Sequence, residues 1–204
     1  MNFLFDIGRV LLDFDFVASL SKLLPAEVDR PRERLELLLE RKDELESGRI
    51  DPEDYVAWAL GVMGSTASHE EFRRAWCDIF TPNEPMWQRV RQLKADGHKL
   101  VLFSNINAIH VPWIYEAHPQ FKLFDGAVMS FEVGLIKPQP GIYAHAIKEH
   151  AMTPSETLYI DDMPENIAAG RAAGFRSWRY EIHNHAAFEQ WLDKTLQQPS
   201  IVSP

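Results

Sequence analysis

Short apolar segments alternate with amphipathic helical segments from Pro82 onward, and this alternation limits the chain to few folds. FLF at residues 3–5 predicts a buried strand, because the segment is continuous, apolar and too short for a stable helix. Further strands are predicted in KLVLFSN (99–105), GAVMSFEVG (126–134), TLYIDD (157–162) and RSWRY (176–180). Strands separated by helices of about 10–15 residues favour an α/β fold with a parallel sheet and right-handed crossovers.

A helical segment interrupts this pattern after the first strand. From about Asp15 to Thr81 apolar residues recur at helical spacing, and no strand is predicted there. One helix is expected in residues 32–50 and ends at Gly48, and two more begin at the N-caps Asp51 and Ser68. We therefore expect a core formed by residues 1–14 and 82–204 and a small helical domain formed by residues 15–81.

Composition and charge disfavour several classes of protein. Hydrophobic residues make up 46% and charged residues 25% of the 204 residues, a balance typical of soluble globular proteins. The net charge of -9 argues against nucleic acid or an anionic membrane as the main partner. The single cysteine, Cys77, excludes an intrachain disulfide and a cysteine zinc cluster. No signal peptide is seen, and no apolar run is near the roughly 20 residues of a membrane span, so we expect a cytoplasmic protein. Its expected oligomeric state is a monomer or a homodimer.

Polar side chains follow the predicted strands. Because the carboxyl ends of parallel strands meet at one edge of a sheet, ligands bind there. Asp161 and Asp162 are adjacent carboxylates, which repel each other unless a cation lies between them. The polar residues at these positions are Asp6, Ser104, Asn105, Asp161 and Asp162, with Lys137 in the loop GLIKPQPG.

These residue types together compose a site for a metal and a phosphate. Carboxylates from two strand ends can hold a hard, oxygen-seeking divalent ion, for which Mg²⁺ is the leading candidate. A lysine and a serine hydroxyl can bind phosphate oxygens. The remaining carboxylate can then attack phosphorus, because the metal and the lysine offset the repulsion between two anions.

The order of FDIG, LFSN, KP and IDDMPEN resembles the four motifs of the haloacid dehalogenase (HAD) superfamily, over nearly the whole chain. The helical segment at residues 15–81 resembles the small helical cap of that family. More closely, FDIG, SNINAIH, KPQPGIY and DDMPEN are similar to a branch of small bacterial phosphatases that includes α-D-glucose-1-phosphate phosphatases. The resemblance implies a Rossmann-like core and Mg²⁺-dependent hydrolysis of a small phosphorylated metabolite, such as a sugar phosphate.

The resemblance also implies roles for the matching residues. Asp6 would be the nucleophile that forms an aspartyl-phosphate, and it would also ligate Mg²⁺. Ser104 and Lys137 would bind the transferring phosphoryl group, with Asn105 assisting.

The metal ligands implied in the same way come from both ends of the chain. Gly8 would offer its backbone carbonyl. Asp162 would ligate Mg²⁺ directly, and Asp161 would do so directly or through water. Asn166 would support the loop that carries Asp161 and Asp162.

Position 8 departs from the superfamily pattern. Most phosphatases of the superfamily have a second aspartate there, which protonates the leaving alcohol and then activates water, a role worth about 10²–10⁴ in rate. Gly8 keeps the carbonyl but lacks the acid. The similar branch also has glycine at this position, so Gly8 does not by itself imply an inactive protein.

Two residues are candidates for substrate contact. Arg9 stands where the superfamily usually has glycine, and it either reaches a substrate phosphate or sugar hydroxyl or points to solvent. His110 matches the pattern SNxNxxH of the similar branch and follows a strand on the side of the site.

Two other functions stay open at this point. A non-catalytic protein that binds phosphate and metal is favoured only by Gly8. A 2-haloacid dehalogenase would use the same nucleophile without a metal, and the pair Asp161–Asp162 counts against it.

Overall fold

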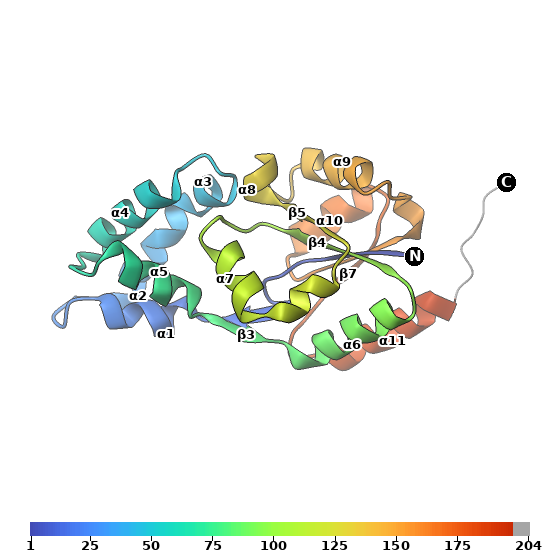
Figure 1. Ribbon diagram of the computed structural model, residues 1–204, viewed down its shortest axis with the longest axis horizontal. Coiled ribbons are helices and arrows are strands. Elements are labelled where there is room, and N and C mark those ends of the chain that lie inside the picture. The colour runs from blue at the N-terminus through green and yellow to red at the C-terminus, as the bar shows by residue number, and fades with distance from the viewer. Residues whose placement is uncertain (198–204) are drawn as a thin grey trace.

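The computed structural model describes residues 1–197, and its centre is a five-stranded parallel sheet in the order β5-β4-β1-β6-β7 (Figure 1). The strands are β1 (Asn2–Phe5), β4 (Lys99–Ser104), β5 (Gly126–Met129), β6 (Thr157–Asp161) and β7 (Arg176–Arg179). Every pair of neighbouring strands runs parallel. The predicted α/β fold with a Rossmann-like parallel sheet is therefore confirmed.

Strand register places the ends of the three central strands side by side. Phe5 at the end of β1 lies opposite Leu102 in β4 and Ile160 in β6. The backbone N–H of Asp6 donates to the carbonyl of Ile160 at 3.0 Å, so β1 is held to β6 up to the point where the chain turns. This register brings residue 6, residue 104 and residue 161 to one edge of the sheet.

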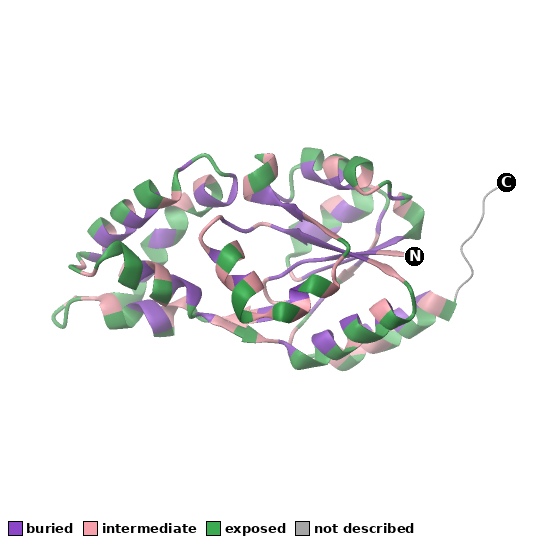
Figure 2. Ribbon diagram, in the orientation of Figure 1, coloured by how far each residue is buried: buried purple, intermediate pink, exposed green. Residues whose placement is uncertain are grey.

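Helices cover both faces of the sheet, because alternate residues of each strand point to opposite faces. The face formed by Phe3, Phe5 and their neighbours packs against α6 (Glu84–Ala95), α7 (His110–Ala117), the turn η3 (Pro119–Leu123) and α11 (His185–Gln197). The opposite face, with Leu4 and Phe103, packs against α9 (Pro140–Glu149) and α10 (Pro164–Ala172). In Figure 2 the central strands β1, β4 and β6 are almost entirely buried, while the helices bury one side and expose the other.

A helical region lies beyond the carboxyl ends of the strands, at the left of Figure 1. It has its own hydrophobic cluster, in which Leu38, Tyr55 and Phe72 are fully buried. The elements are α1 (Phe16–Leu20), η1 (Ser21–Leu23), α2 (Pro31–Glu36), η2 (Leu37–Arg41), α3 (Lys42–Glu46), α4 (Pro52–Met63) and α5 (His69–Cys77). The predicted N-caps are present: Asp51 accepts from Glu53 N–H, and Ser68 forms a capping box with Glu71. The division at residues 15 and 81 stays a prediction.

The single helix expected in residues 32–50 is instead α2, η2 and α3 in succession, with 3₁₀ geometry in the middle. Tyr55 explains part of the difference, because its hydroxyl donates to the carbonyl of Leu38 at 3.0 Å. The backbone N–H of Lys42 bonds to Leu39 and not to Leu38, which is the tighter 3₁₀ pattern. A partner far along the chain thus changes the local helix.

Two strands were not predicted. β2 (Leu12–Phe14) pairs antiparallel with β3 (Phe80–Pro82), so the chain enters and leaves the helical region through a two-stranded ribbon. Neither strand has a period-2 pattern long enough to be recognised alone. The segment 126–134 also differs, since β5 ends at Met129 and a short helix α8 (Ser130–Val133) follows. The turn η4 (Pro154–Glu156) precedes β6.

No helix within residues 1–197 has the length and hydropathy of a membrane span.

Candidate active site

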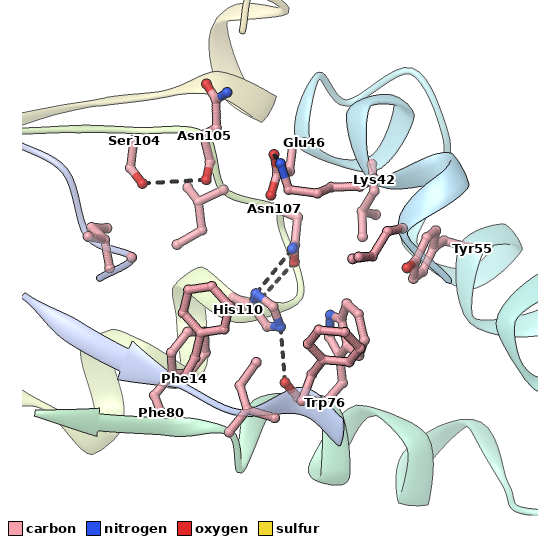
Figure 3. A pocket seen from close by; sticks show the side chains of 17 residues that line it. Phe14, Lys42, Glu46, Tyr55, Trp76, Phe80, Ser104, Asn105, Asn107 and His110 are labelled. Carbon is pink, nitrogen blue, oxygen red and sulfur yellow. Dashed lines mark hydrogen bonds and ion pairs between the residues drawn. The ribbon is translucent and has the colours of Figure 1, made fainter. Parts of the chain in front are cut away.

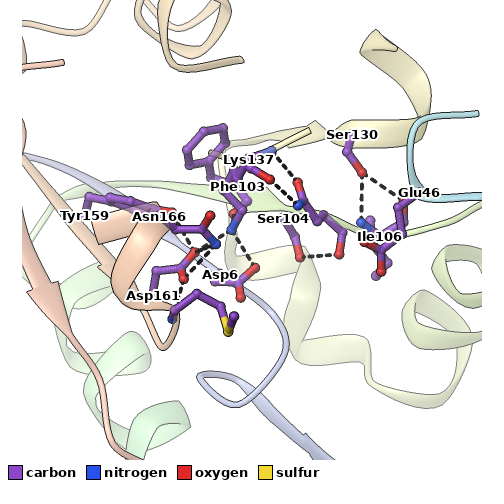
Figure 4. A network of polar contacts seen from close by, with 12 residues as sticks. Asp6, Glu46, Phe103, Ser104, Ile106, Ser130, Lys137, Tyr159, Asp161 and Asn166 are labelled. Carbon is purple, nitrogen blue, oxygen red and sulfur yellow. Dashed lines mark hydrogen bonds and ion pairs between the residues drawn. The ribbon is translucent and has the colours of Figure 1, made fainter. Parts of the chain in front are cut away.

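Lys137 is the centre of the polar network at the carboxyl edge of the sheet (Figure 4). Its side chain is 1% exposed, and Nζ donates to Asp6 Oδ1 at 3.0 Å, to Asp161 Oδ2 at 2.5 Å and to the carbonyl of Phe103 at 2.9 Å. Burial lowers the pKa of Lys137, but the carboxylates of Asp161 and Asp6 outweigh it and hold the pKa above its ordinary value. The lysine is therefore a fixed cation between two carboxylates.

Asp161 is fully buried and both of its carboxylate oxygens are occupied. Besides Lys137, the hydroxyl of Tyr159 donates to Oδ2 at 2.6 Å. The side chain of Asn166 and the backbone N–H of Met163 donate to Oδ1 at 3.0 and 2.9 Å. A carboxylate with this many donors is rigid, and its oxygens have little capacity left for a metal. This geometry favours contact through water over direct ligation by Asp161, and Asn166 lies in hydrogen-bond contact with that carboxylate.

Asp162 differs from its neighbour, because it is half-buried and its carboxylate accepts no side-chain hydrogen bond within residues 1–197. Burial, Asp6 and Asp161 together raise the pKa of Asp162 to about 7. Carboxylate oxygens of Asp6, Asp161 and Asp162 all lie within 4.8 Å of one another. When all three carboxyl groups are ionised, three carboxylates and one ammonium leave two uncompensated negative charges, which a divalent cation would cancel. The donor set is all oxygen, so these residues fit Mg²⁺.

Asp6 follows β1 directly and is 8% exposed. Burial raises the pKa of Asp6, while the Lys137 ammonium and a hydrogen bond from Ser104 oppose that rise. Gly8 lies two residues further on, and Phe14 explains why a side chain there would be crowded. A Cβ atom on residue 8 would lie 3.2 Å from Cε1 of Phe14.

Ser104 and Asn105 come from the end of β4, next to β1. Ser104 is 2% exposed, and its hydroxyl also lies 3.4 Å from the carbonyl of Asn105. Asn105 fixes the lysine loop, since its Nδ2 donates to the carbonyl of Lys137 at 2.9 Å and its Oδ1 accepts from Lys137 N–H at 2.8 Å. In this structure the Asn105 amide positions Lys137.

The two substrate-contact candidates lie apart from this network. Arg9 adopts a left-handed backbone conformation with φ 56°, forms an ion pair with Asp13 and stacks over the ring of Phe14 at 4.5 Å. The structure does not bring the Arg9 side chain together with Lys137. His110 lines a cavity beside the network, but both ring nitrogens have partners. Burial lowers the pKa of His110 to about 4, so the imidazole is neutral at pH 7.

Some residues of the site escaped the sequence analysis. Tyr159 lies inside a buried strand, where the sequence pattern predicts that an aromatic side chain packs in the core. Its hydroxyl nevertheless donates a hydrogen bond to Asp161. Lys42 and Glu46 of α3 form an ion pair at 2.9 Å and line the cavity from the helical region. Only the spacing of four residues between Lys42 and Glu46 is visible in the sequence, and it is common on solvated helices.

The fold and the site together define a class: α/β proteins with an aspartate after the first strand, a buried lysine and an acid pair at the carboxyl edge of a parallel sheet. The family model for haloacid dehalogenase-like hydrolases matches residues 3–174, so the chain belongs to that family. The predicted superfamily and the prediction of a hydrolytic enzyme are thereby confirmed.

Relatives and solved structures agree with this assignment. The chain is 29% identical to a D-ribitol-5-phosphate phosphatase of Bacteroides thetaiotaomicron, over 96% of this chain and 98% of that protein. It is 30% identical to a sesquiterpene phosphatase of Aspergillus oryzae, over 65% of this chain and 68% of that protein. The crystal structure of a HAD family enzyme of B. thetaiotaomicron has the same fold, with a TM-score of 0.76 and 22% identity over 91% of this chain and 97% of that chain. That enzyme has also been crystallised with magnesium and inorganic phosphate.

Proposed function

We propose that the protein is a Mg²⁺-dependent phosphatase that hydrolyses a small phosphorylated metabolite through an aspartyl-phosphate on Asp6. The observation that carries the proposal is the single buried Lys137 Nζ, which lies 3.0 Å from Asp6 and 2.5 Å from Asp161. It supplies a fixed positive charge beside the carboxylate that must approach a phosphoryl anion. The relatives named as phosphatases and the magnesium and phosphate complexes of the structural neighbour support the same chemistry.

The residues divide the reaction between them. A carboxylate oxygen of Asp6 forms a bond to phosphorus while the bond from phosphorus to the alcohol oxygen breaks, and water then cleaves the aspartyl-phosphate to release phosphate. Lys137 and Ser104 stabilise the charge on the phosphoryl oxygens. Mg²⁺, held by Asp6, Asp162 and the carbonyl of Gly8, with Asp161 through water, would supply further neutralisation of that charge. Gly8 has no side chain, so the proton for the leaving oxygen does not come from position 8.

The helical region completes the site. We propose that residues 15–81 act as a cap that encloses the alcohol part of the substrate and limits the access of water. Its cavity-facing residues, among them Lys42 and Glu46, lie across from Ser104 and Asn105 (Figure 3).

Phosphate release with Mg²⁺ and with EDTA tests the proposal. The wild-type protein is expected to release phosphate only with Mg²⁺, and Asp6→Asn is expected to lose at least about 10³-fold in kcat, because an amide cannot form the acyl-phosphate. Asp13→Asn is the matched control, since Asp13 carries a carboxylate near the same turn but binds Arg9. Equal turnover by wild type and Asp6→Asn would contradict the proposal and favour a binding protein.

A further inference from the structure

A cavity of about 270 Å³ extends from the phosphoryl site into the helical region. Gly8, Ser104 and Asn105 line its inner end, and side chains of α3, α4 and α5 line its outer end (Figure 3). The alcohol part of a bound phosphate ester would occupy this space. Its volume is near the lower end of the ~300–1,000 Å³ of small-molecule sites, which favours a compact group.

The walls of this space, which we name the aromatic cavity, are mainly apolar. Phe14 and Phe80 come from the two-stranded ribbon, and Phe16 and Trp76 come from the helical region. Leu39 of η2 adds an aliphatic wall and is 44% exposed. In Figure 3 the rings of Phe14 and Phe80 lie on one side of His110 and the ring of Trp76 lies on the other.

The polar side chains at the base of the aromatic cavity are already bonded to the protein. Asn107 Oδ1 accepts from the backbone N–H groups of Ile109 and His110, both at 3.0 Å. Its Nδ2 donates to His110 Nδ1 at 3.1 Å, and His110 Nε2 donates to the carbonyl of Trp76 at 3.0 Å. These contacts together fix one tautomer of the imidazole and leave neither residue free for a ligand hydroxyl.

Elsewhere along the wall, two polar side chains are also occupied, and one ion pair is present. The Tyr55 hydroxyl donates to Leu38, and the Asn105 amide is occupied by the backbone of Lys137. Lys42 and Glu46 are paired with each other at 2.9 Å. Among the described residues that line the cavity, the buried polar side-chain atoms without a hydrogen-bond partner are the donor Trp76 Nε1 and the acceptor Glu46 Oε2.

A polyol in this space would lose hydration at every hydroxyl that lies away from Trp76 Nε1 and the Lys42–Glu46 pair. Each hydroxyl buried without a partner costs free energy, whereas each buried hydrocarbon group gains it. The aromatic cavity therefore discriminates against ligands with many hydroxyl groups.

We propose that the site takes phosphate monoesters of compact apolar alcohols, with a hydrocarbon ring or short chain in the aromatic cavity and any further polar group next to Trp76 Nε1 or the Lys42–Glu46 pair. The inference rests on the proposed function and names its substrate class, in place of the sugar phosphate that the sequence resemblance suggested. Hydrolysis consumes one water and releases the apolar alcohol and inorganic phosphate.

Two matched pairs of esters test this inference. Cyclohexylmethyl phosphate and glucose 6-phosphate share a six-membered ring on a CH₂–O–P group, and pentyl phosphate and ribitol 5-phosphate share a five-carbon chain. We expect kcat/KM, measured with Mg²⁺, to be at least about tenfold higher for the apolar member of each pair.

Leu39→Gln and Leu37→Gln provide matched variants on the same 3₁₀ helix. Both leucines are surface-accessible, 44% and 43% exposed, but only Leu39 lines the aromatic cavity. Leu39→Gln is expected to lower the ratio of cyclohexylmethyl to glucose 6-phosphate turnover about threefold or more, while Leu37→Gln leaves it unchanged.

Three results separate the inference from the proposed function. Turnover that is equal or faster for the polyol esters would overturn the inference and leave the phosphatase intact. A ratio that Leu39→Gln does not change would also overturn it. If no ester is hydrolysed, the proposed function fails. Calorimetric binding of the same pairs to Asp6→Asn with Mg²⁺ then still decides the cavity preference. Tighter binding of the apolar esters supports the inference, and equal or weaker binding overturns it.

Discussion

At the scale of single residues, Gly8 and Phe14 lie close to each other in the folded chain. The superfamily commonly has a catalytic aspartate at this position, and here a Cβ would lie 3.2 Å from the Phe14 ring. Phe14 also supports Arg9 through a cation–π contact. The loss of the acid and the presence of the aromatic side chain are thus two parts of one local arrangement.

A double-mutant cycle tests that link. Gly8→Ala is expected to lower the free energy of unfolding by about 1 kcal/mol through overpacking, and to cost nothing when combined with Phe14→Leu. Gly61→Ala is the control, because nothing lies within 4 Å of its added Cβ in the middle of α4, where alanine favours the helix. Urea denaturation of the four proteins measures the coupling, and additive effects would exclude steric contact between residues 8 and 14.

His110 predicts how stability depends on pH. Its pKa is about 4 in the folded protein and about 6.5 when unfolded, so the unfolded chain binds the proton more tightly between these values. The contribution of His110 is therefore complete above pH 6.5 and is lost as pH falls towards 4. Lowering the pH from 7 to 5 should therefore reduce the free energy of unfolding by about 2 kcal/mol through protonation of His110.

The measurement compares urea unfolding at pH 7 and pH 5 for wild type, His110→Gln and His69→Gln. His110→Gln should lose about 2 kcal/mol less than wild type over this interval. His69, which lies on the surface beside Glu53, is the control. An equal pH dependence in wild type and His110→Gln would show that this imidazole is not buried neutral.

At the scale of elements, α5 shows how a local signal places a helix against the core. The capping box of Ser68 and Glu71 satisfies N–H groups at its start, and Phe72 and Trp76 of the same helix enter the hydrophobic cluster of the helical region. Trp76 also accepts from His110 through its carbonyl and lines the aromatic cavity. The start of α5 therefore affects the geometry of a wall of the site.

Ser68→Ala should lower the free energy of unfolding by about 1 kcal/mol, because it removes the acceptor for Glu71 N–H. Thr66→Ala serves as the control, since Thr66 is exposed and lies before the cap. Chemical denaturation gives both values. Equal stabilities of the two variants would mean that the capping box contributes nothing beyond exposed-surface effects.

At the scale of the whole molecule, strands from the two ends of the chain meet at one charge cluster. Asp6, Asp161 and Asp162 repel one another there, with Lys137 as their buried cation. A divalent cation that binds the folded state should therefore stabilise the entire protein.

Thermal unfolding with and without Mg²⁺ tests this coupling. We expect saturating Mg²⁺ to raise the Tm of wild type by roughly 5 °C relative to EDTA. Asp162→Asn should raise the Tm in EDTA, because it removes one repelling charge, and should abolish most of the Mg²⁺ effect. Asp193→Asn, on the exposed side of α11, should leave the Mg²⁺ effect intact. A full Mg²⁺ shift in Asp162→Asn would exclude that carboxylate as a ligand.

Prediction from the sequence succeeded where the signal was local. The five strands of the sheet, the caps at Asp51 and Ser68 and the polar residues at the strand ends are each visible in a few consecutive residues. It failed where distant segments decide the result. The ribbon β2–β3, the 3₁₀ helix at Leu37–Arg41 and the short helix α8 all depend on partners far along the chain.

The amino-acid sequence by itself determined the α/β class and the family and placed polar side chains at the strand ends, because periodicity and short motifs can be seen in a few consecutive residues. Only the tertiary structure decided how those side chains divide the work. Asp161 is occupied by Tyr159, Asn166 and Lys137, while the Asp162 carboxylate has no hydrogen-bonded side chain among residues 1–197, although the two are neighbours in sequence. The tertiary structure also decided the character of the cavity, because the packing of the helical region over the strand ends selects which side chains line it and which of their polar atoms remain free.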